Sequence, residues 1–123
     1  MGKSVNDVVL DAALNYIKNN CTRMTACSQE PTTYTEGNAT YSLADVTLAS
    51  GDFTVANDTS GRKVTIAQKT GVTVDSTGTA NHVALLDVSN TVLLYVTTAT
   101  SQALTAANTM TFNSWKINIQ DPT

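Results

Sequence analysis

Charged and reactive side chains are scarce in this sequence. Charged residues make up 14% of its 123 residues, and it has a single histidine and two cysteines. The charged share is well below the quarter that is usual for a globular protein. The net charge is −3 and the seven basic residues are scattered, whereas a protein that neutralises nucleic-acid phosphates needs clustered lysine and arginine. We therefore expect no nucleic-acid partner.

Long apolar runs are also missing. No run approaches the roughly 20 residues that a transmembrane helix needs. Residues Met1–Ser4 lead into an amphipathic segment, without the apolar stretch and cleavage site of a signal peptide. We expect no membrane partner and synthesis in a cytoplasm.

The sequence contains no motif for catalysis, metal binding or cofactor binding. His82 is the only histidine and lies in an apolar segment, while a zinc site takes three or four ligands. A G-x-S-x-G elbow, a phosphate-binding loop and a dinucleotide-binding glycine motif are all absent. Half of the eight aspartates stand beside glycine, asparagine or serine, where we expect them to form turns. We predict a protein that is not an enzyme and that has no catalytic, metal-binding or cofactor-binding residues and no cofactor.

The two cysteines, Cys21 and Cys27, allow two interpretations. On one strand they would lie roughly 20 Å apart, whereas a disulfide needs Cα atoms within about 7 Å. The residues between them include no glycine, proline or asparagine to form a turn. Buried free thiols are the first interpretation. The second is a role as intersubunit contacts, through disulfides between the subunits of an assembly.

Threonine, by contrast, is abundant, with 22 positions, and its branched side chain favours extended backbone. The length predicts a single domain over residues 1–123. Within it, residues 4–19 are predicted to form a helix with Ser4 as N-cap. Its apolar residues recur at helical spacing and are Val9, Ala12, Ala13, Tyr16 and Ile17. Such a helix covers a sheet face or docks on a neighbouring subunit, and we favour the first.

Residues 21–123 carry the pattern of short strands separated by turns. The clearest pair is 82–88 and 91–97, joined at Ser89-Asn90 and apolar on both faces, which predicts a central hairpin. Residues 31–42 are polar and turn-like, which predicts a loop; Tyr34 and Tyr41 flank it as candidate contact residues. The fold class is therefore mainly β: an antiparallel sandwich or barrel with one N-terminal α-helix.

Nine segments spread over nearly the whole chain carry a family resemblance, and none of them is an active-site signature. They are Leu14-Asn15-Tyr16-Ile17-Lys18, Cys21-Thr22-Arg23-Met24, Glu30-Pro31-Thr32-Thr33-Tyr34, Leu43-Ala44-Asp45-Val46, Ser50-Gly51-Asp52-Phe53-Thr54, Ser60-Gly61-Arg62-Lys63-Val64-Thr65, Ala80-Asn81-His82-Val83-Ala84-Leu85, Leu94-Tyr95-Val96-Thr97-Thr98 and Ser114-Trp115-Lys116-Ile117-Asn118-Ile119. Together these segments resemble a family of small virion structural proteins of tailed bacteriophages and prophages.

The resemblance implies a structural part of a bacteriophage virion, made in the host bacterial cytoplasm. A capsid decoration protein, bound to the shell in many copies, is our first expectation, and a neck or tail component is the alternative. The expected partners are the major capsid protein or neck and tail proteins, with further copies of the chain in a homo-oligomer. A β-sandwich module that binds host-surface glycan is a second alternative, from a different class of function.

Overall fold

The computed structural model describes residues 2–122, which form two compact units. The helical unit consists of the residues up to Asn20, Ala49–Gln68 and those from Asn113 onward. The sheet unit consists of Cys21–Leu48 and Lys69–Phe112. The single-domain assignment stays a prediction, and each unit is described by itself.

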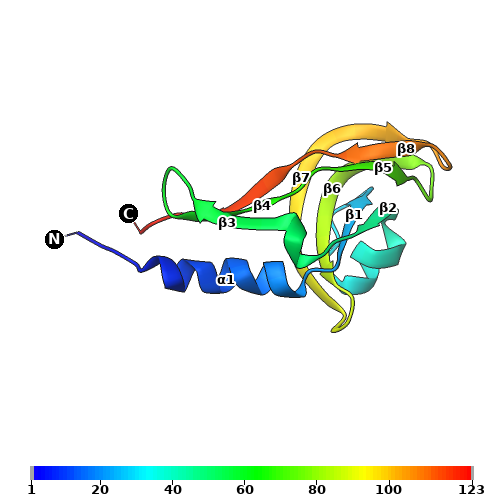
Figure 1. The fold of residues 1–123 in the computed structure, drawn as a ribbon. Helices are drawn as coiled ribbons and strands as arrows, with labels where there is room; N and C mark the ends of the chain where they lie inside the picture. Colours follow the sequence, from blue (N-terminus) through cyan, green and yellow to red (C-terminus); the bar gives the residue numbers. More distant parts are fainter. Residues whose placement is uncertain (1, 123) are drawn as a thin grey trace. The chain divides into compact units, whose positions relative to one another are not determined.

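The helical unit combines one α-helix with a three-stranded antiparallel sheet (Figure 1). Its elements are α1 (Asp7–Asn20), the 3-10 helix η2 (Ser50–Asp52), β3 (Phe53–Asn57), β4 (Arg62–Ile66) and β9 (Trp115–Ile119). The strand order is β3-β4-β9, and α1 packs against β3 and β4. Leu14 of the helix and Val64 and Ile66 of β4 are fully buried. This small apolar core holds the helix on the sheet.

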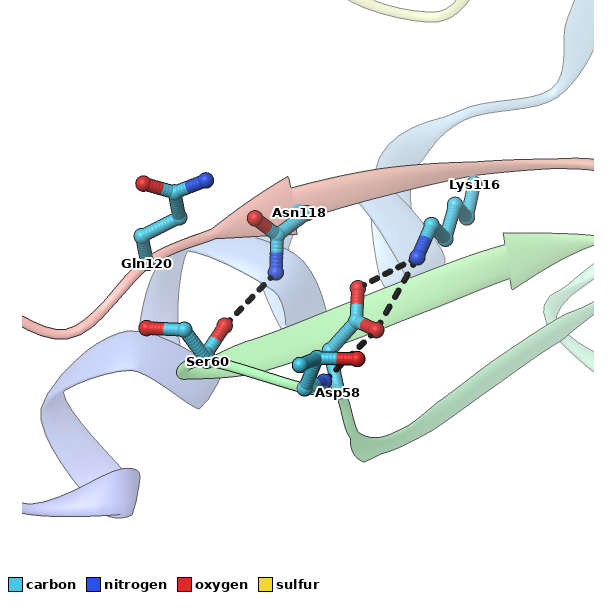
Figure 2. A pocket seen from close by; sticks show the side chains of 6 residues that line it. Asp58, Ser60, Lys116, Asn118 and Gln120 are labelled. Atoms are coloured by element: carbon cyan, nitrogen blue, oxygen red, sulfur yellow. Dashed lines mark hydrogen bonds and ion pairs between the residues drawn. The ribbon is translucent and has the colours of Figure 1, made fainter.

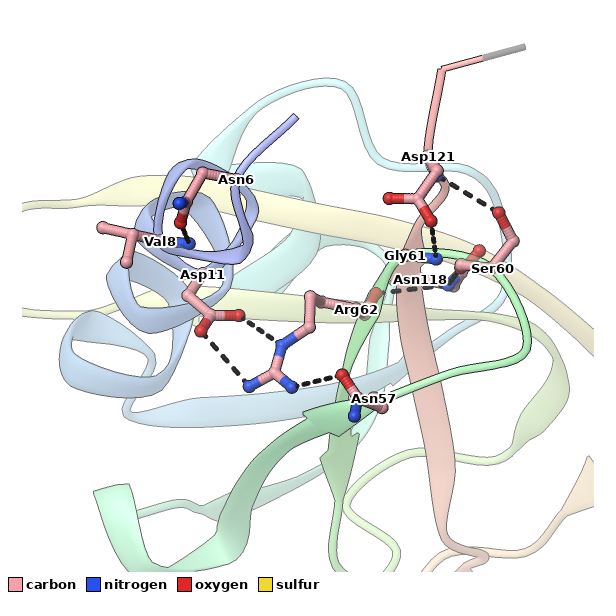
Figure 3. Close-up of polar contacts among 9 residues, drawn as sticks. All are labelled: Asn6, Val8, Asp11, Asn57, Ser60, Gly61, Arg62, Asn118 and Asp121. Carbon is pink, nitrogen blue, oxygen red and sulfur yellow. Dashed lines mark hydrogen bonds and ion pairs between the residues drawn. The ribbon is translucent and has the colours of Figure 1, made fainter. Parts of the chain in front are cut away.

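With Ser4 as N-cap, helix α1 would begin at Val5. It begins two residues later, at Asp7. The side-chain Oδ1 of Asn6 accepts a hydrogen bond from the Val8 N–H at 2.9 Å (Figure 3). The backbone carbonyl of Asn6 accepts another from the Val9 N–H at 2.9 Å. Asparagine caps a helix as well as serine does. The prediction of Ser4 was therefore wrong: Asn6, nearer to the first apolar turn, is the N-cap.

The sheet unit is built on a four-stranded antiparallel sheet with the order β2-β1-β6-β7 (Figure 1). Its strands are β1 (Arg23–Cys27), β2 (Ser42–Thr47), β6 (Gly78–Asp87) and β7 (Val92–Leu104). A second, two-stranded sheet pairs β5 (Lys69–Thr73) with β8 (Thr109–Phe112). β1 lies between two strands, so four of its five residues are buried.

The predicted hairpin exists, but only one of its strands is central. β6 and β7 pair over most of their lengths, and β6 lies inside the sheet, while β7 is an edge strand. In the first half of β7, Leu93 and Val96 are only partly buried, and residues 98–103 of the second half are exposed. An apolar run alone does not tell a half-covered edge strand from a buried one. The prediction of a central β7 was therefore wrong.

The segment predicted as a polar loop contains a π-helix, η1 (Glu36–Thr40). The Glu36 carboxylate accepts hydrogen bonds from the backbone N–H and the hydroxyl of Thr32, both at 2.8 Å. Gly37 is buried, and a Cβ there would lie 3.2 Å from Leu93 Cδ1. The prediction of a loop was wrong because this packing is set by residues distant in sequence.

The predicted fold class is confirmed: the chain is mainly β and antiparallel, with one N-terminal α-helix. Between residues 2 and 122, each of the three sheets is open, and none closes into a barrel.

Candidate functional site

Both cysteines are free and buried in the sheet unit. Cys21 is 2% exposed and Cys27 is not exposed at all. The Cys27 thiol lies 3.7 Å from the Gly37 carbonyl and 3.4 Å from the Thr25 hydroxyl. Burial raises the pKa of Cys21 to about 11 and also raises the pKa of Cys27. The interpretation as buried free thiols is confirmed, and an intersubunit disulfide at Cys21 or Cys27 stays a prediction that would require this core to open.

Native thiol labelling should therefore be slow. At pH 8 a thiol with a pKa near 11 is on the order of 0.1% thiolate, against roughly 10% for a thiol of pKa 9. We expect an aromatic disulfide reagent to modify Cys21 at least about 100-fold more slowly in the folded protein than in denaturant. Stopped-flow absorbance with the single variants Cys21→Ser and Cys27→Ser resolves the two sites. Equal rates in native buffer and denaturant would contradict the burial.

The structure brings a cysteine and the histidine together. Cys27 in β1 is the direct cross-strand partner of His82 in β6, a juxtaposition that no local motif in the sequence announces. A nucleophilic cysteine needs a base that lowers its pKa. Here burial raises the pKa of Cys27, its thiol faces Thr25 and Gly37, and His82 Nδ1 pairs with Asn81 Oδ1 at 2.6 Å. The pair lacks the arrangement of an activated nucleophile.

Tyr34 and Tyr41 lie at the two ends of the π-helical segment. Both are partly buried and pack against a small cluster formed by Cys27, Ala84 and Leu86. The negative charge of Glu36 raises the pKa of Tyr41. The two rings thus anchor this segment on the sheet. Their role as intersubunit contacts stays a prediction, carried by the part of each ring that is exposed.

A shallow polar depression lies at the end of the β3–β4 hairpin in the helical unit (Figure 2). Its lining residues are Asp58, Thr59, Ser60, Lys116, Asn118 and Gln120. Lys116 Nζ donates to both carboxylate oxygens of Asp58, at 2.7 and 2.9 Å, and this contact lowers the pKa of Asp58. The Asn118 amide donates to the Ser60 and Arg62 carbonyls at 3.0 and 3.2 Å. Because these groups are engaged with one another, the depression offers no free general base.

Helix α1 is fixed on its sheet by polar contacts from one side. Arg62 of β4 forms a bidentate ion pair with Asp11, with Nε–Oδ1 at 2.8 Å and Nη2–Oδ2 at 3.2 Å, and its third nitrogen reaches Asn57 at 2.7 Å (Figure 3). Lys18 donates to the Phe53 carbonyl at 3.2 Å. A planar guanidinium held at three points restricts rotation of the helix.

The opposite side of α1 carries an exposed apolar surface, which we call the α1 stripe and define by five residues. These are Val8, Val9, Ala12, Ala13 and Tyr16, and all five are exposed. Val8 is 74% exposed, Val9 61% and Tyr16 54%. The sequence predicted much of this set as the face toward the sheet. That prediction was wrong, because Leu10 and Leu14 form a second apolar face, and the larger leucines are the buried ones.

Two carboxyl groups meet where Val74 bridges to Ala44 in the sheet unit. Asp45 is an exposed residue, but partial desolvation of its carboxyl group raises its pKa, and the neighbouring Asp75 raises it further through a hydrogen bond and through its charge. The folded protein thus binds a proton at Asp45 more tightly than the unfolded chain does. The protonated Asp45 side chain therefore stabilises the fold in full below its ordinary pKa of 3.8. This contribution is lost as the pH rises through the pKa that Asp45 has in the folded protein.

Asp45→Asn should therefore raise the free energy of unfolding at pH 7. We expect less than about 1 kcal/mol, because Asp45 is exposed enough for solvent screening. Urea unfolding at pH 4 and pH 7 measures the effect, which should be smaller at pH 4. Asp45→Glu retains the charge and serves as the control. A variant less stable than the wild type at pH 7 would contradict the assignment.

Among residues 2–122, no group of three or more histidine, cysteine, aspartate or glutamate residues is placed to hold a metal ion. The only α-helix of this part of the chain, α1, is too short to cross a bilayer. The chain matches no model of a known protein family, and no curated protein and no solved structure is significantly similar to it.

Proposed function

We propose that this chain is a non-enzymatic structural component of a tailed-phage virion, in the first place a capsid decoration protein that binds the shell in many copies. Neck and tail positions are the alternatives within the same class. Two lines of support meet here: the resemblance of segments throughout the sequence to small virion proteins, and the surfaces of the folded chain.

The α1 stripe is the observation that carries the proposal. Three large apolar side chains with exposed fractions of 54–74% share one helix face. The charged residues of the helix lie elsewhere, and Asp11 and Lys18 among them are engaged with the sheet. Depletion of charge and enrichment in tyrosine distinguish the core of a protein interface from the rest of a surface. A stripe of this kind is stabilised when a neighbouring protein covers it.

Many weak contacts suffice for such a role. Five residues bury little area, so a single contact is weak. A protein bound in many copies around a shell, and itself associated into oligomers, gains affinity through multivalency without new contacts. Three further features support a binding role rather than catalysis. They are the scarcity of charge, the buried thiols and the polar depression whose groups pair with one another.

Incorporation into particles tests the proposal. Purified virions of the parent phage, washed and sedimented, should contain the protein in stoichiometric amounts. Val9→Glu, supplied in place of the wild type, should lower the amount per particle at least about tenfold, because a carboxylate would be desolvated in the contact. Asn15→Glu, exposed on the same helix outside the stripe, is the control. Absence of the wild-type protein from washed particles would refute the virion role.

A glycan-binding module is the candidate from another class, and the polar depression is the surface that would serve it. Its amide, hydroxyl and ammonium groups suit sugar hydroxyls, yet none of the six lining residues is aromatic. Retention on immobilised host polysaccharide that is lost in Asn118→Ala would favour this function over the structural one.

A further inference from the structure

We propose that the α1 stripe pairs with the α1 stripe of a second copy of this chain, with the two helices antiparallel across a twofold axis between Ala12 and Ala13. This inference names the first partner of the surface used above, so it rests on the proposed role of the stripe as an interface. It concerns self-association, which does not require the virion to be present.

The order of side chains along the stripe is self-complementary. Small residues, Ala12 and Ala13, stand in the middle, with Val9 one turn before them and Tyr16 one turn after. In an antiparallel pair centred between the alanines, Val9 of each copy faces Tyr16 of the other. The alanines let the helix axes approach closely at the centre, and the larger side chains fill the space on either side. An interface between two identical copies needs this symmetry, whereas an interface with a different protein does not.

The distribution of charge allows two copies to meet at the stripe. The chain carries a net charge of −3, so two copies repel each other overall, and this repulsion matters least where neither copy contributes a charged side chain. The stripe itself has no charged residue, and Asp11 is turned to Arg62 on the sheet side. Antiparallel packing also sets the partly positive N-terminal end of each helix beside the partly negative C-terminal end of the other.

The edge of the large sheet is a weaker surface for self-association. β7 is the last strand in the order β2-β1-β6-β7, but its register against β6 shifts twice, between Ala80 and His82 and between Leu85 and Leu86. Bulges of this kind twist an edge strand and impede pairing with another chain. The helix stripe has no comparable interruption.

The area buried between the two helices limits the affinity of the dimer. One helix face covers less than the roughly 800 Å² per partner of a standard interface. We therefore expect a reversible dimer with a Kd on the order of 10 to 100 μM, and no permanent oligomer of the purified protein.

Charge reversal at the centre of the stripe tests the inference on the full chain. Ala13→Glu and Ala13→Lys both preserve helix propensity at an exposed position, so the fold is retained. Each alone should weaken dimerisation at least about tenfold, because two like charges face each other at the axis. A 1:1 mixture of the two variants should restore association. Sedimentation equilibrium measures the Kd of each sample, with Asn15→Glu as the matched control.

Three results would overturn the inference. They are a wild-type chain that stays monomeric up to about 1 mM, a dimer that Ala13→Glu leaves intact, and a mixture that associates no better than its components. These results are separate from those on the virion role. A monomeric chain found in washed particles would refute the helix pair alone, and a dimeric chain absent from particles would refute the virion role alone.

Discussion

Replacing Gly61 by alanine should lower the free energy of unfolding of the helical unit by about 3–5 kcal/mol. Gly61 ends the β3–β4 connection with φ +74°, and an added Cβ would clash with the Ile119 carbonyl oxygen and lie 2.9 Å from the Gln120 backbone. The left-handed backbone alone costs an alanine roughly 1–2 kcal/mol. The remainder comes from separating β9 from the hairpin, because the contact is with backbone that cannot rotate away.

Two other glycines separate these contributions. Gly71 has φ +64° but open space around its Cβ position, so Gly71→Ala should show the backbone cost without the clash. Gly51 has neither, and Gly51→Ala should change stability by less than about 0.5 kcal/mol. Thermal unfolding followed by circular dichroism ranks the three. If Gly61→Ala were no worse than Gly71→Ala, the close approach of β9 would be wrong.

Leu14→Ala should cost about 2–5 kcal/mol, while Val9→Ala should cost less than about 0.5 kcal/mol. Leu14 is fully buried on the sheet, so truncation leaves a cavity, whereas Val9 is 61% exposed and alanine has the higher helix propensity. Urea unfolding of the two variants, at protein concentrations below the dimer Kd, gives the comparison directly.

This pair of variants decides which face of α1 is free. A large loss for Val9→Ala in the monomer would mean that the stripe packs inside the chain. The surface proposed for assembly would then not exist. A small loss in the free energy of unfolding for Leu14→Ala would likewise mean that the Leu14 face of the helix is not the buried one.

Local signals predicted most element positions. The strands expected at 82–88 and 91–97 overlap β6 (Gly78–Asp87) and β7 (Val92–Leu104), which pair as the predicted hairpin. Turn residues and alternating side chains are properties of a few neighbouring residues, so they can be recognised without the fold.

Features that depend on distant residues were missed. The helix has two apolar faces, and only the sheet that receives Leu10 and Leu14 shows which one is buried. The edge position of β7 depends on the strand order, and the π-helix depends on Gly37 meeting Leu86 and Leu93. The pairing of Cys27 with His82 likewise joins residues 55 positions apart across β1 and β6. Tertiary packing overrides local preference at each of these points.

Two reactive side chains of the folded chain are engaged with neighbouring residues. The thiol nearest to the histidine is a buried, neutral donor, and the carboxylate in the depression is paired with Lys116. The α1 stripe is an exposed apolar surface on a helix whose other side is fixed to the sheet by Asp11 and Lys18. This surface is why we propose that the chain acts through contacts between proteins.

Electron cryo-microscopy of the parent virion tests this account most directly. It predicts density for the helical and sheet units at symmetry-related positions on the particle, in the first place over the capsid shell, with the α1 stripe covered by a neighbouring protein. Particles that lack this density and contain none of the protein by mass spectrometry would contradict it.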